Sequence, residues 1–273
     1  MAARFPGTLG KSLINPSDKN RGDLMLSDVE RERYSRQIRL FAEEGQERLK
    51  KKRVFIAGAG GLGSIVSLYL AALGFGRIRI ADCDSVELSN LNRQILHSSS
   101  GLGQSKAQSA LKTLSDINPE VEVEVLQERI SEGSVDRLLQ GCDMIMDAMD
   151  NFPTRYLLNC AALKRDIPLF HGAISGFQGQ ATTIVPGRTA CLRCIFPRAP
   201  PAQTSPSLGP TCGIIGSIQV NEALKFALGR GELLEDRLVL WDGLSSSLDE
   251  ISCERNLSCP DCGHLQRIER GDR

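Results

Sequence analysis

Long hydrophobic runs, an excess of one charge and a secretion signal are all missing from this sequence of 273 residues. No segment approaches the roughly 18 to 20 apolar residues of a membrane-spanning helix, and the start Met-Ala-Ala-Arg-Phe-Pro lacks the apolar centre of a signal peptide. Lysine plus arginine equals aspartate plus glutamate, at 33 each. Net charge therefore favours neither a nucleic-acid partner nor a membrane partner, and we expect a cytoplasmic protein with local binding sites.

Histidine is also scarce. The three histidines, His97, His171 and His264, show no metal-ligand spacing, so we assign them no role, and no Ser-His-Asp arrangement is apparent. The sequence contains no internal repeat. Because a hydrophobic fraction of 41% is enough for a large core, we expect one α/β domain over residues 26–273.

From residue 53 onward, apolar strand-like runs alternate with helix-like segments. The strand-like runs are apolar throughout, as expected when helices cover both faces of a parallel sheet. The sequence therefore predicts a doubly wound, Rossmann-like, mostly parallel sheet that is extended by C-terminal strands. The expected strands are 53–57, 77–82, 120–126, 143–148, 167–172, 179–185 and 237–241, and the expected helices are 61–73, 104–116, 134–140, 153–165 and 216–228.

The N-terminal end and one internal loop depart from this alternation. Residues 1–25 lack hydrophobic periodicity, so we expect a mobile tail, with a transit peptide as the alternative. Ser27 and Glu30 form a capping box, which predicts that a helix carrying Arg36 follows. Five prolines within 197–210 predict an extended surface loop.

A glycine-rich loop stands between the first expected strand and the helix after it. Its glycines permit a tight turn and close approach of the backbone to a phosphate, and the helix start presents free N–H groups to an anion. A glycine-rich turn that only packs is the alternative. Asp82 follows about one strand later, where a carboxylate can accept hydrogen bonds from both ribose hydroxyls. The predicted nucleotide cradle therefore comprises Gly58, Gly60, Gly61, Gly63 and Asp82.

The next polar segments favour ATP over NAD. An arginine guanidinium group and a lysine ammonium group together can neutralise a triphosphate. The pyrophosphate of a dinucleotide, bound at the N-terminus of a helix, does not require them. Asp150, with Asp84 as a second candidate, suits Mg²⁺ between phosphates. Helix capping by Asp150 or Asn151 is the alternative there, and capping is also the alternative for Asp84. The predicted ATP site thus adds Asp84, Ser89, Asn90, Arg93, Gln94, Lys106, Asp150 and Asn151.

Four of the nine cysteines form two C-x-x-C pairs, Cys191 with Cys194 and Cys259 with Cys262. Four thiolates from two such turns can complete a tetrahedral zinc site without an open position, so we expect a structural Zn²⁺ that pins the C-terminal tail onto the domain. Four unligated cysteines are the alternative. This pattern favours a reducing compartment over disulfides. The cysteines expected to be small core residues are Cys83, Cys142 and Cys160.

Together these motifs resemble the ThiF/MoeB/HesA family, bacterial relatives of ubiquitin-activating enzymes. The resemblance extends from Tyr34 to Gly263. It rests on Arg33-Tyr-Ser-Arg36-Gln-Ile, Gly58-Ala-Gly-Gly-Leu-Gly63, Asp82-Cys-Asp84, Leu88-Ser-Asn-Leu-Asn-Arg93-Gln94, Lys106, Asp147-Ala-Met-Asp150-Asn151, both cysteine pairs and Gly213-Ile-Ile-Gly-Ser-Ile-Gln219.

The resemblance implies an adenylyltransferase. Its substrates would be ATP and the C-terminal glycine of a small ubiquitin-like sulfur carrier protein ending in Gly-Gly, with pyrophosphate released, for thiamine, molybdopterin or related biosynthesis. It implies that Asp82 holds the ribose, that Arg36, Arg93 and Lys106 neutralise the phosphates, and that Asp150 carries Mg²⁺. In this family the arginine matching Arg36 enters the neighbouring subunit's site, which implies a homodimer.

The resemblance also divides the expected domain into two halves. Residues of about 53–172 would bind the nucleotide, and residues of about 173–263 would bind the carrier and the zinc. Many family members have a reactive cysteine shortly after the first C-x-x-C pair, but the loop 196–210 contains none. Cys212 follows that loop and is expected to be a buried packing residue, with the reactive role as the alternative. No rhodanese-like segment follows Cys262, so we expect sulfur to come from a separate sulfurtransferase.

Two functions of other classes stay open at this point. A NAD-dependent oxidoreductase would use the same glycine loop and Asp82, but it has no use for the pair Arg93 and Lys106. A non-catalytic scaffold that docks a ubiquitin-like partner would not need the polar set around Asp150.

Overall fold

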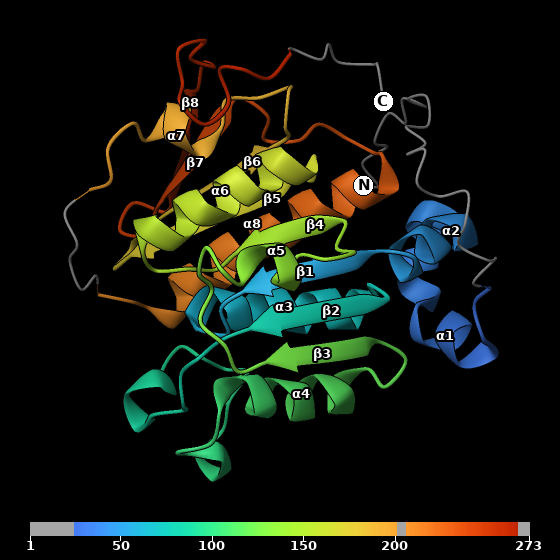
Figure 1. Ribbon diagram of the computed structural model, residues 1–273. Coiled ribbons are helices and arrows are strands. Elements are labelled where there is room, and N and C mark those ends of the chain that lie inside the picture. The colour runs from blue at the N-terminus through green and yellow to red at the C-terminus, as the bar shows by residue number, and fades with distance from the viewer. Residues whose placement is uncertain (1–24, 201–205, 267–273) are drawn as a thin grey trace.

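The computed structural model describes residues 25–200 and 206–266, which contain one eight-stranded sheet with helices on both faces (Figure 1). The strand order is β3-β2-β1-β4-β5-β6-β7-β8. Strands β1 to β5 pair in parallel, and β6, β7 and β8 continue the sheet with antiparallel pairing. The expected mostly parallel sheet with C-terminal strands is therefore confirmed. The strands are β1 (Arg53–Ala57), β2 (Arg77–Ala81), β3 (Glu122–Leu126), β4 (Met144–Asp147), β5 (Leu169–Ser175), β6 (Gln178–Ile184), β7 (Arg237–Asp242) and β8 (Ser247–Ser252).

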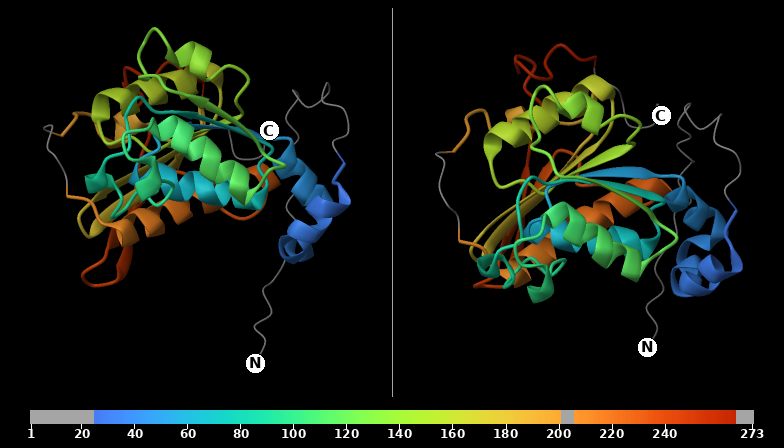
Figure 2. Two further views of the ribbon diagram at one scale, coloured as in Figure 1. Left: turned by 90° about the horizontal axis from the view of Figure 1, so that it is seen from below. Right: turned by 60° about the horizontal axis from the view of Figure 1, so that its bottom comes forward.

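Different helices cover the two faces of the sheet (Figure 2). In β1, Val54 and Ile56 join the core beneath one set of helices, whereas Phe55 and Ala57 join the core beneath the other. All four side chains are fully buried, which explains why every position of the strand after Arg53 is apolar. The first set comprises α3 (Gly61–Leu73), α4 (Lys106–Ile117) and α8 (Gly209–Leu228), and the second comprises α5 (Val135–Leu138), α6 (Phe152–Arg165) and α7 (Leu192–Ile195).

Two N-terminal helices precede the sheet, α1 (Asp28–Arg33) and α2 (Ser35–Lys50). The predicted capping box of α1 is confirmed, because the Glu30 amide donates to Ser27 Oγ at 3.2 Å and the Ser27 amide donates to Glu30 Oε2 at 2.7 Å. Helix α2 ends shortly before β1 begins, so both helices lie beside the amino ends of the parallel strands (Figure 1). The predicted tail lies outside the described residues except for its last residue, Met25.

Three C-terminal elements differ from the prediction. Helix α8 begins at Gly209, not at residue 216, because Pro210 occupies the first turn, where its missing N–H has no helical partner to lose. The short helix α7 lies inside the first C-x-x-C pair and was not predicted. Strand β8 was also missed, because it is an edge strand with mostly exposed side chains and has no apolar run. Two short 3₁₀ turns, η2 (Leu88–Asn90) and η3 (Ser99–Gly101), lie between β2 and α4.

The expectation that three cysteines are core residues is wrong for two of them. Cys83 is exposed because it lies in the loop beyond the last residue of β2, and Cys160 is exposed on α6. Cys142 is half-buried and packs at the edge of the core beneath α5 and α6. A position beside an apolar run therefore did not establish burial for these thiols.

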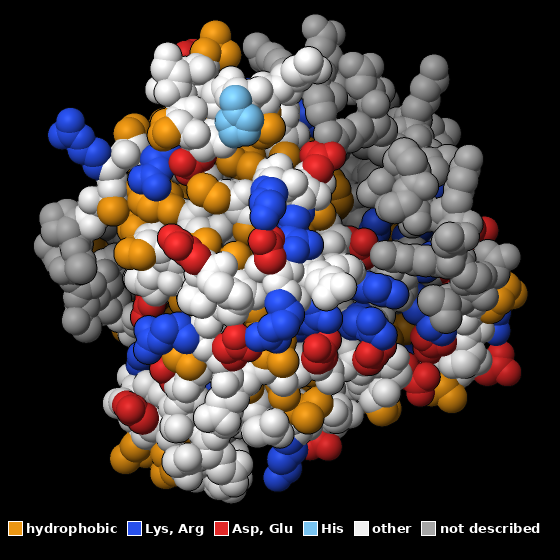
Figure 3. All heavy atoms as spheres, viewed as in Figure 1, with side chains coloured by type: hydrophobic (Ala, Val, Ile, Leu, Met, Phe, Trp, Pro, Cys, Tyr) orange, Lys and Arg blue, Asp and Glu red, His pale blue; other side chains and the backbone are white. Residues whose placement is uncertain are grey.

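The surface seen in Figure 3 carries interleaved charges, with a row of Lys and Arg beside Asp and Glu. Arg79 pairs with Glu124 at 2.7 Å across β2 and β3, and similar ion pairs join Arg77 to Glu122 and Arg137 to Glu128. This face is therefore not a patch of one sign. Within residues 25–200 and 206–266, every helix is too short or too polar to cross a lipid bilayer.

Candidate functional site

The strand order reverses between β1 and β4, which are neighbours in the sheet. Ligands of open α/β sheets bind outside the carboxyl ends of the strands at such a switch point. The structure places the glycine loop after β1, Asp82 after β2 and Asp150 after β4 at this edge. A pocket opens there, and its lining includes Gly58, Asp82, Asp84, Met149 and Asn151. The predicted residues of these three loops therefore lie along one edge of the sheet.

The glycine loop requires its glycines. Gly58 has φ of +96°, a conformation that side chains disfavour. A Cβ atom on Gly63 would lie 2.1 Å from the Gly58 carbonyl oxygen, so the start of α3 packs directly on the loop. Gly60 occupies the N-cap of α3, and no side chain caps the helix there. Free amides and the positive end of the helix dipole therefore face the switch point, which is the geometry of an anion site.

Asp82 is held beside this loop. Its Oδ2 accepts from the Ala59 amide at 2.7 Å, and its Oδ1 accepts from the Asp84 amide at 2.8 Å. His97 supports the loop from the other side, because its Nε2 lies 2.9 Å from the Ala59 carbonyl oxygen and its Nδ1 lies 3.0 Å from Ser109 Oγ. Burial lowers the pKa of His97, so the neutral ring donates to the carbonyl and accepts from the hydroxyl. The carboxylate and the loop thus form one rigid unit.

Lys106 brings a cation to the same edge. Its side chain is only 7% exposed, and Nζ lies 3.1 Å from Asp84 Oδ2. The Lys106 amide donates to the Asp84 carbonyl oxygen at 2.9 Å, whereas the Asp84 side chain caps no helix. The capping alternative for Asp84 is therefore wrong. Among the described residues the ammonium group, carried on a buried stem, pairs with the exposed Asp84 carboxylate alone, so it is well prepared to bind an anionic ligand.

The segment around η2 supplies the arginine. Arg93 Nη1 donates to the Ser89 carbonyl oxygen at 2.9 Å, and the Arg93 stem lies against Gly61 at the start of α3. Asn90 is buried and accepts from the Glu87 amide, which fixes the turn. Gln94 is buried beside Gly60, and its Oε1 has no hydrogen-bond partner among the described residues. Arg93 and Gln94 therefore lie at the start of α3, beside Gly61 and Gly60.

The loop after β4 separates the roles of Asp150 and Asn151. Asn151 is the N-cap of α6, since its Oδ1 accepts from the Thr154 amide at 3.0 Å. Asp150 is exposed and its Oδ1 accepts from Asn151 Nδ2 at 3.2 Å. The capping alternative is thus correct for Asn151 and wrong for Asp150, whose carboxylate is left facing solvent beside the pocket.

Arg36 is not brought to this site. It lies in the first turns of α2, beside the amino ends of the strands, whereas the glycine loop lies at their carboxyl ends (Figure 1). The Arg36 side chain is exposed, and no ion pair joins it to an acidic group among the residues that the structure describes. Within one chain, Arg36 is therefore far from the glycine loop at which its phosphate ligand is expected.

Cys212 is buried behind the glycine loop. It lies in the first turn of α8 with 1% exposure, and a Cβ atom on Gly61 would meet its Sγ at 2.6 Å. Burial raises the pKa of Cys212, although the charge of Arg93 opposes the shift. A buried, protonated thiol is a packing group and not a nucleophile. The packing prediction for Cys212 is therefore confirmed.

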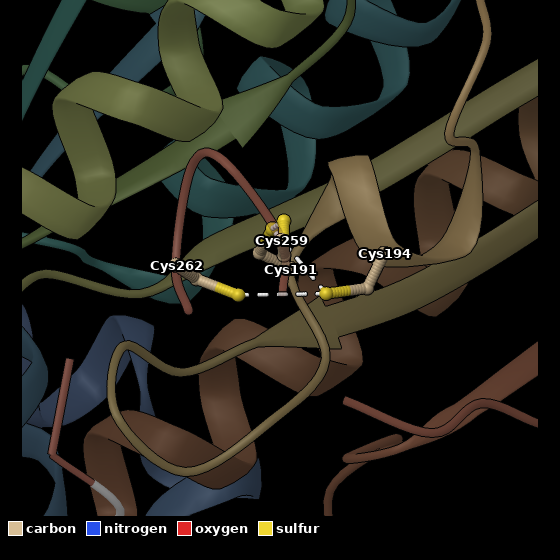
Figure 4. A group of neighbouring side chains, drawn as sticks. All are labelled: Cys191, Cys194, Cys259 and Cys262. Carbon is tan, nitrogen blue, oxygen red and sulfur yellow. Dashed lines mark hydrogen bonds between the residues drawn. The ribbon is translucent and has the colours of Figure 1, made fainter. Parts of the chain in front are cut away.

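The two C-x-x-C pairs converge on one point (Figure 4). Cys191 Sγ lies 3.9 Å from Cys194 Sγ and 3.7 Å from Cys259 Sγ, and Cys194 Sγ lies 3.4 Å from Cys262 Sγ. Sulfurs in a tetrahedron around zinc at about 2.3 Å are about 3.8 Å apart, so the spacing fits that ion. The donor set therefore forms as predicted and joins α7 to the C-terminal segment.

A second polar cluster was missed from the sequence. Asp147, His171 and Arg155 are all buried beneath the loop after β4, where His171 Nδ1 lies 2.7 Å from Asp147 Oδ2. The available signal was a polar residue inside each of two apolar strands, Asp147 at the end of β4 and His171 within β5. No local motif joins the two residues, which lie 24 positions apart in the chain.

The fold and the site together define an α/β protein of the nucleotide-binding type, with Lys106 and Arg93 near its glycine loop. The chain belongs to the ThiF family, whose model matches residues 34–261. It is 43% identical over 248 residues to the SAMP-activating enzyme E1 of Haloferax volcanii, covering 88% of this chain and 92% of that protein. It is 42% identical over 247 residues to the sulfur carrier protein adenylyltransferase of Thermus thermophilus, covering 86% and 91%. The family resemblance seen in the motifs is therefore confirmed.

Two further similarities concern length and fold. The adenylyltransferase and sulfurtransferase MOCS3-1 of Zea mays is 40% identical over 240 residues, which cover 85% of this chain but 51% of that protein. Among solved structures, Escherichia coli MccB in complex with a MccA peptide variant superposes with a TM-score of 0.78 at 22% identity, over 85% of this chain and 75% of that one. At this identity the structural likeness supports the fold alone.

Proposed function

We propose that this protein uses ATP to adenylate the C-terminal glycine of a small ubiquitin-like sulfur carrier protein ending in Gly-Gly. The observation that carries the proposal is the near full-length likeness to a sulfur carrier protein adenylyltransferase, combined with the glycine loop held against Asp82, with Lys106 beside Asp84 and Arg93 beside Gly61. The carrier carboxylate attacks the α-phosphorus of ATP, a carboxyl–phosphate bond forms, and the bond to pyrophosphate breaks. This chemistry requires positioning and charge neutralisation and no protein nucleophile.

Each polar residue at the switch point has a role in this reaction. The Asp82 carboxylate accepts from the ribose hydroxyls, and the amides at the start of α3 bind phosphate oxygens. Arg93 and Lys106 neutralise the charge that develops on pyrophosphate. The polar side chains Ser89, Asn90, Gln94 and Asn151 complete the nucleotide site, with Asp84 holding Lys106 in place before ATP binds.

Two metal ions belong to the proposal. Asp150 would hold Mg²⁺, because its exposed carboxylate stands at the pocket edge and hard cations prefer carboxylate and phosphate oxygens. When bound, Mg²⁺ would offset phosphate charge and assist pyrophosphate departure. The four clustered cysteines would hold a structural Zn²⁺ without an open coordination position. The zinc would tie the C-terminal segment to α7 within the half of the chain, about 173–263, that we assign to carrier binding.

The position of Arg36 favours a homodimer. Because α2 lies at the amino ends of the strands, Arg36 can reach a glycine loop only if that loop belongs to a second copy of the chain. Each active site would then combine Asp150 of one subunit with Arg36 of the other. Cys212 takes no part in covalent sulfur transfer, since it is buried under Gly61, so we assign sulfur delivery to a separate sulfurtransferase.

The two rival functions explain less. A nicotinamide-dependent oxidoreductase leaves Lys106 and Arg93 without a purpose, and the relatives at 43% and 42% identity are an activating enzyme and an adenylyltransferase. A docking scaffold has no need for a lysine whose buried stem brings its ammonium group beside Asp84. We also retain a cytoplasmic location as a proposal, since it follows from the reducing conditions that free cysteines favour.

The deciding measurement is ATP–pyrophosphate exchange with Mg²⁺. The purified chain is offered ubiquitin-like carriers ending in Gly-Gly, and each carrier lacking its terminal glycine is the matched control. We expect exchange with at least one intact carrier and none with its truncated form. ATP binding without exchange across the panel contradicts adenylation of this carrier class, and enhanced NADH fluorescence on binding revives the oxidoreductase.

A further inference from the structure

The loop that carries Asp150 rests on a buried charged cluster formed by Asp147, His171 and Arg155. Asp147 ends β4 with 0% exposure, His171 on β5 has 0%, and Arg155 on α6 has 6%. Buried charges are costly unless they are paired and hydrogen-bonded, so a cluster of this kind at a chosen point of the fold calls for an explanation. The proposed chemistry uses none of these three residues directly.

Asp147 makes contacts through both carboxylate oxygens and through its carbonyl oxygen. Its Oδ2 lies 2.7 Å from His171 Nδ1 and 3.6 Å from Arg155 Nε, and its Oδ1 accepts from the Met149 amide at 3.1 Å. Its carbonyl oxygen accepts from Gln219 Nε2 at 2.8 Å. One residue therefore links the end of β4, the loop after it, β5, α6 and α8.

His171 acts as a neutral donor. Burial lowers the pKa of His171, and the charge of Arg155 lowers it further, although the hydrogen bond to Asp147 opposes both. In the neutral ring, Nδ1–H donates to Asp147, which leaves Nε2 to accept from Gln180 Nε2 at 3.3 Å. The tautomer is thus fixed by a partner on each side, one of them on β6.

Arg155 holds the loop from the helix that follows it. Its Nη2 donates to the Met149 carbonyl oxygen at 2.5 Å and to the Gly172 carbonyl oxygen at 3.4 Å. The loop from Asp147 to Asn151 is therefore held at its first residue, at both polar backbone atoms of Met149, and at Asn151, which caps α6. Asp150 is the exposed residue between these anchors.

We propose that Asp147, His171 and Arg155 are positioning residues that fix the loop from Asp147 to Asn151 and thereby hold the Asp150 carboxylate in place for the nucleotide and its cation. This inference rests on the proposed function for the role of Asp150, but the rigidity of the loop can be measured without any ligand. The residues that position the site therefore extend beneath the pocket into the core of the sheet.

The test compares His171→Asn with His171→Gln, a matched pair of amide side chains. Asparagine places its amide near the position of Nδ1 and can still donate to Asp147, whereas glutamine places its amide near the position of Nε2 and leaves the Asp147 carboxylate short of a donor. Hydrogen exchange of the ligand-free protein is followed in the peptide covering residues 148–152. We expect exchange about tenfold faster than wild type in His171→Gln and near wild type in His171→Asn, since lost anchoring raises the population of open loop states.

Kinetics supply the second readout. In ATP–pyrophosphate exchange, His171→Gln should lower kcat about tenfold and raise the Mg²⁺ concentration for half-maximal rate, with the KM for ATP changed less than about twofold. Thr183→Val is the control, because Thr183 is fully buried on β6 and donates to Glu222 in a different polar cluster. This control should lower Tm without changing the exchange of 148–152 or the Mg²⁺ dependence.

Identical loop exchange and Mg²⁺ dependence in wild type, His171→Asn and His171→Gln would overturn the positioning role, as would the same shift in Thr183→Val. If the histidine variants do not fold, Arg155→Lys serves instead, since it keeps the charge but lacks the guanidinium group that reaches two carbonyl oxygens. Wild-type loop exchange and Mg²⁺ dependence in that variant overturn the inference equally. A wild-type protein without exchange activity counts against the proposed function, whereas an active wild type with unaffected variants counts against the positioning cluster alone.

Discussion

Cys212 Sγ occupies the space that a side chain at Gly61 would need, because a Cβ atom built on Gly61 lies 2.6 Å from that sulfur. The first turn of α8 therefore packs against the first turn of α3, directly behind the amides that face the phosphate site. Gly61 and Cys212 form one packed unit. This contact fixes where α3 begins. Glycine is therefore needed at position 61 because no side chain fits there, and not only because of the backbone conformation.

This contact predicts non-additive stability. Gly61→Ala should destabilise the fold by about 1–3 kcal/mol through overpacking, whereas Cys212→Ala should cost about 1 kcal/mol for the small cavity it leaves. The double variant should be more stable than the sum of the two changes, because the new methyl group fills the vacated space. Urea unfolding of the four proteins measures the coupling, and strict additivity contradicts the contact.

Thiol labelling distinguishes the cysteines by exposure. In the native protein, iodoacetamide at neutral pH should modify exposed Cys83 most readily and leave Cys212 unmodified. Cys160 is exposed but should react slowly, because burial of its thiol and the neighbouring Asp261 raise its pKa to about 11. Burial raises the pKa of Cys212, so it is protonated as well as inaccessible. Mass spectrometry of the digested protein gives the modified positions. Rapid modification of Cys212, or loss of adenylation in Cys212→Ala, would revive the reactive role.

The charge of Lys106 should matter for catalysis and little for folding. Lys106→Met keeps most of the buried stem but removes the ammonium group, so we expect kcat for ATP–pyrophosphate exchange to fall about 100-fold or more. Its ion partner Asp84 is 63% exposed, and such pairs contribute about 0–1 kcal/mol, so Tm should barely change. Parallel kinetic and thermal measurements test both statements. A large loss of stability with normal kcat would instead make Lys106 a structural residue.

Removal of metal from the four-cysteine cluster should loosen the C-terminal segment selectively. The purified chain should contain about one zinc per molecule, because four sulfurs at this spacing leave no open position. A strong chelator, or Cys194→Ser, should lower Tm and open the segment around Cys259 and Cys262 to protease while the glycine loop stays protected. Cys83→Ser is the matched control, since Cys83 is exposed in the loop after β2 and lies outside the cluster, whereas Cys160 contacts Asp261 between Cys259 and Cys262. Less than about half an equivalent of metal after gentle purification contradicts the zinc site.

Much of the nucleotide-binding half could be predicted from the sequence because local signals agree there. The strand Arg53–Ala57 and the helix Gly61–Leu73 were predicted with the bounds that the structure shows, since an apolar strand, a glycine turn and an apolar helix follow one another directly. Strand β8 could not be predicted, because its side chains are mostly exposed and its pairing with β7 is visible only in the tertiary structure.

The same contrast holds within the site. Gly58 and Asp82 each follow an expected strand, and Lys106 stands at the start of an expected helix, so their positions can be read from the sequence. The pairing of Asp147 with His171 joins residues 24 positions apart through the neighbouring parallel strands β4 and β5, so it became visible only once the strand order was known. Capping at the start of α6 was ambiguous between two adjacent residues, and the helix start at Phe152 decides it for Asn151.

The separation of Arg36 from its own glycine loop predicts that two different inactive proteins restore activity when mixed. Arg36→Ala and Asp150→Ala should each be inactive alone but fold and associate normally, because both side chains are exposed. In a mixed dimer, the subunit that keeps Asp150 receives Arg36 from its partner, so one of the two sites is complete. Random reassortment of a homodimer makes half of the dimers mixed, and exchange activity should therefore recover to about a quarter of wild type. Co-expression produces the reassortment, and a different affinity tag on each chain verifies the mixed dimers. The control is the doubly substituted chain co-expressed with wild type, whose isolated mixed dimers should be inactive because neither site combines Asp150 of one subunit with Arg36 of the other. Absence of recovery in verified mixed dimers means that Arg36 acts within its own chain or not at all, and the composite site is then excluded.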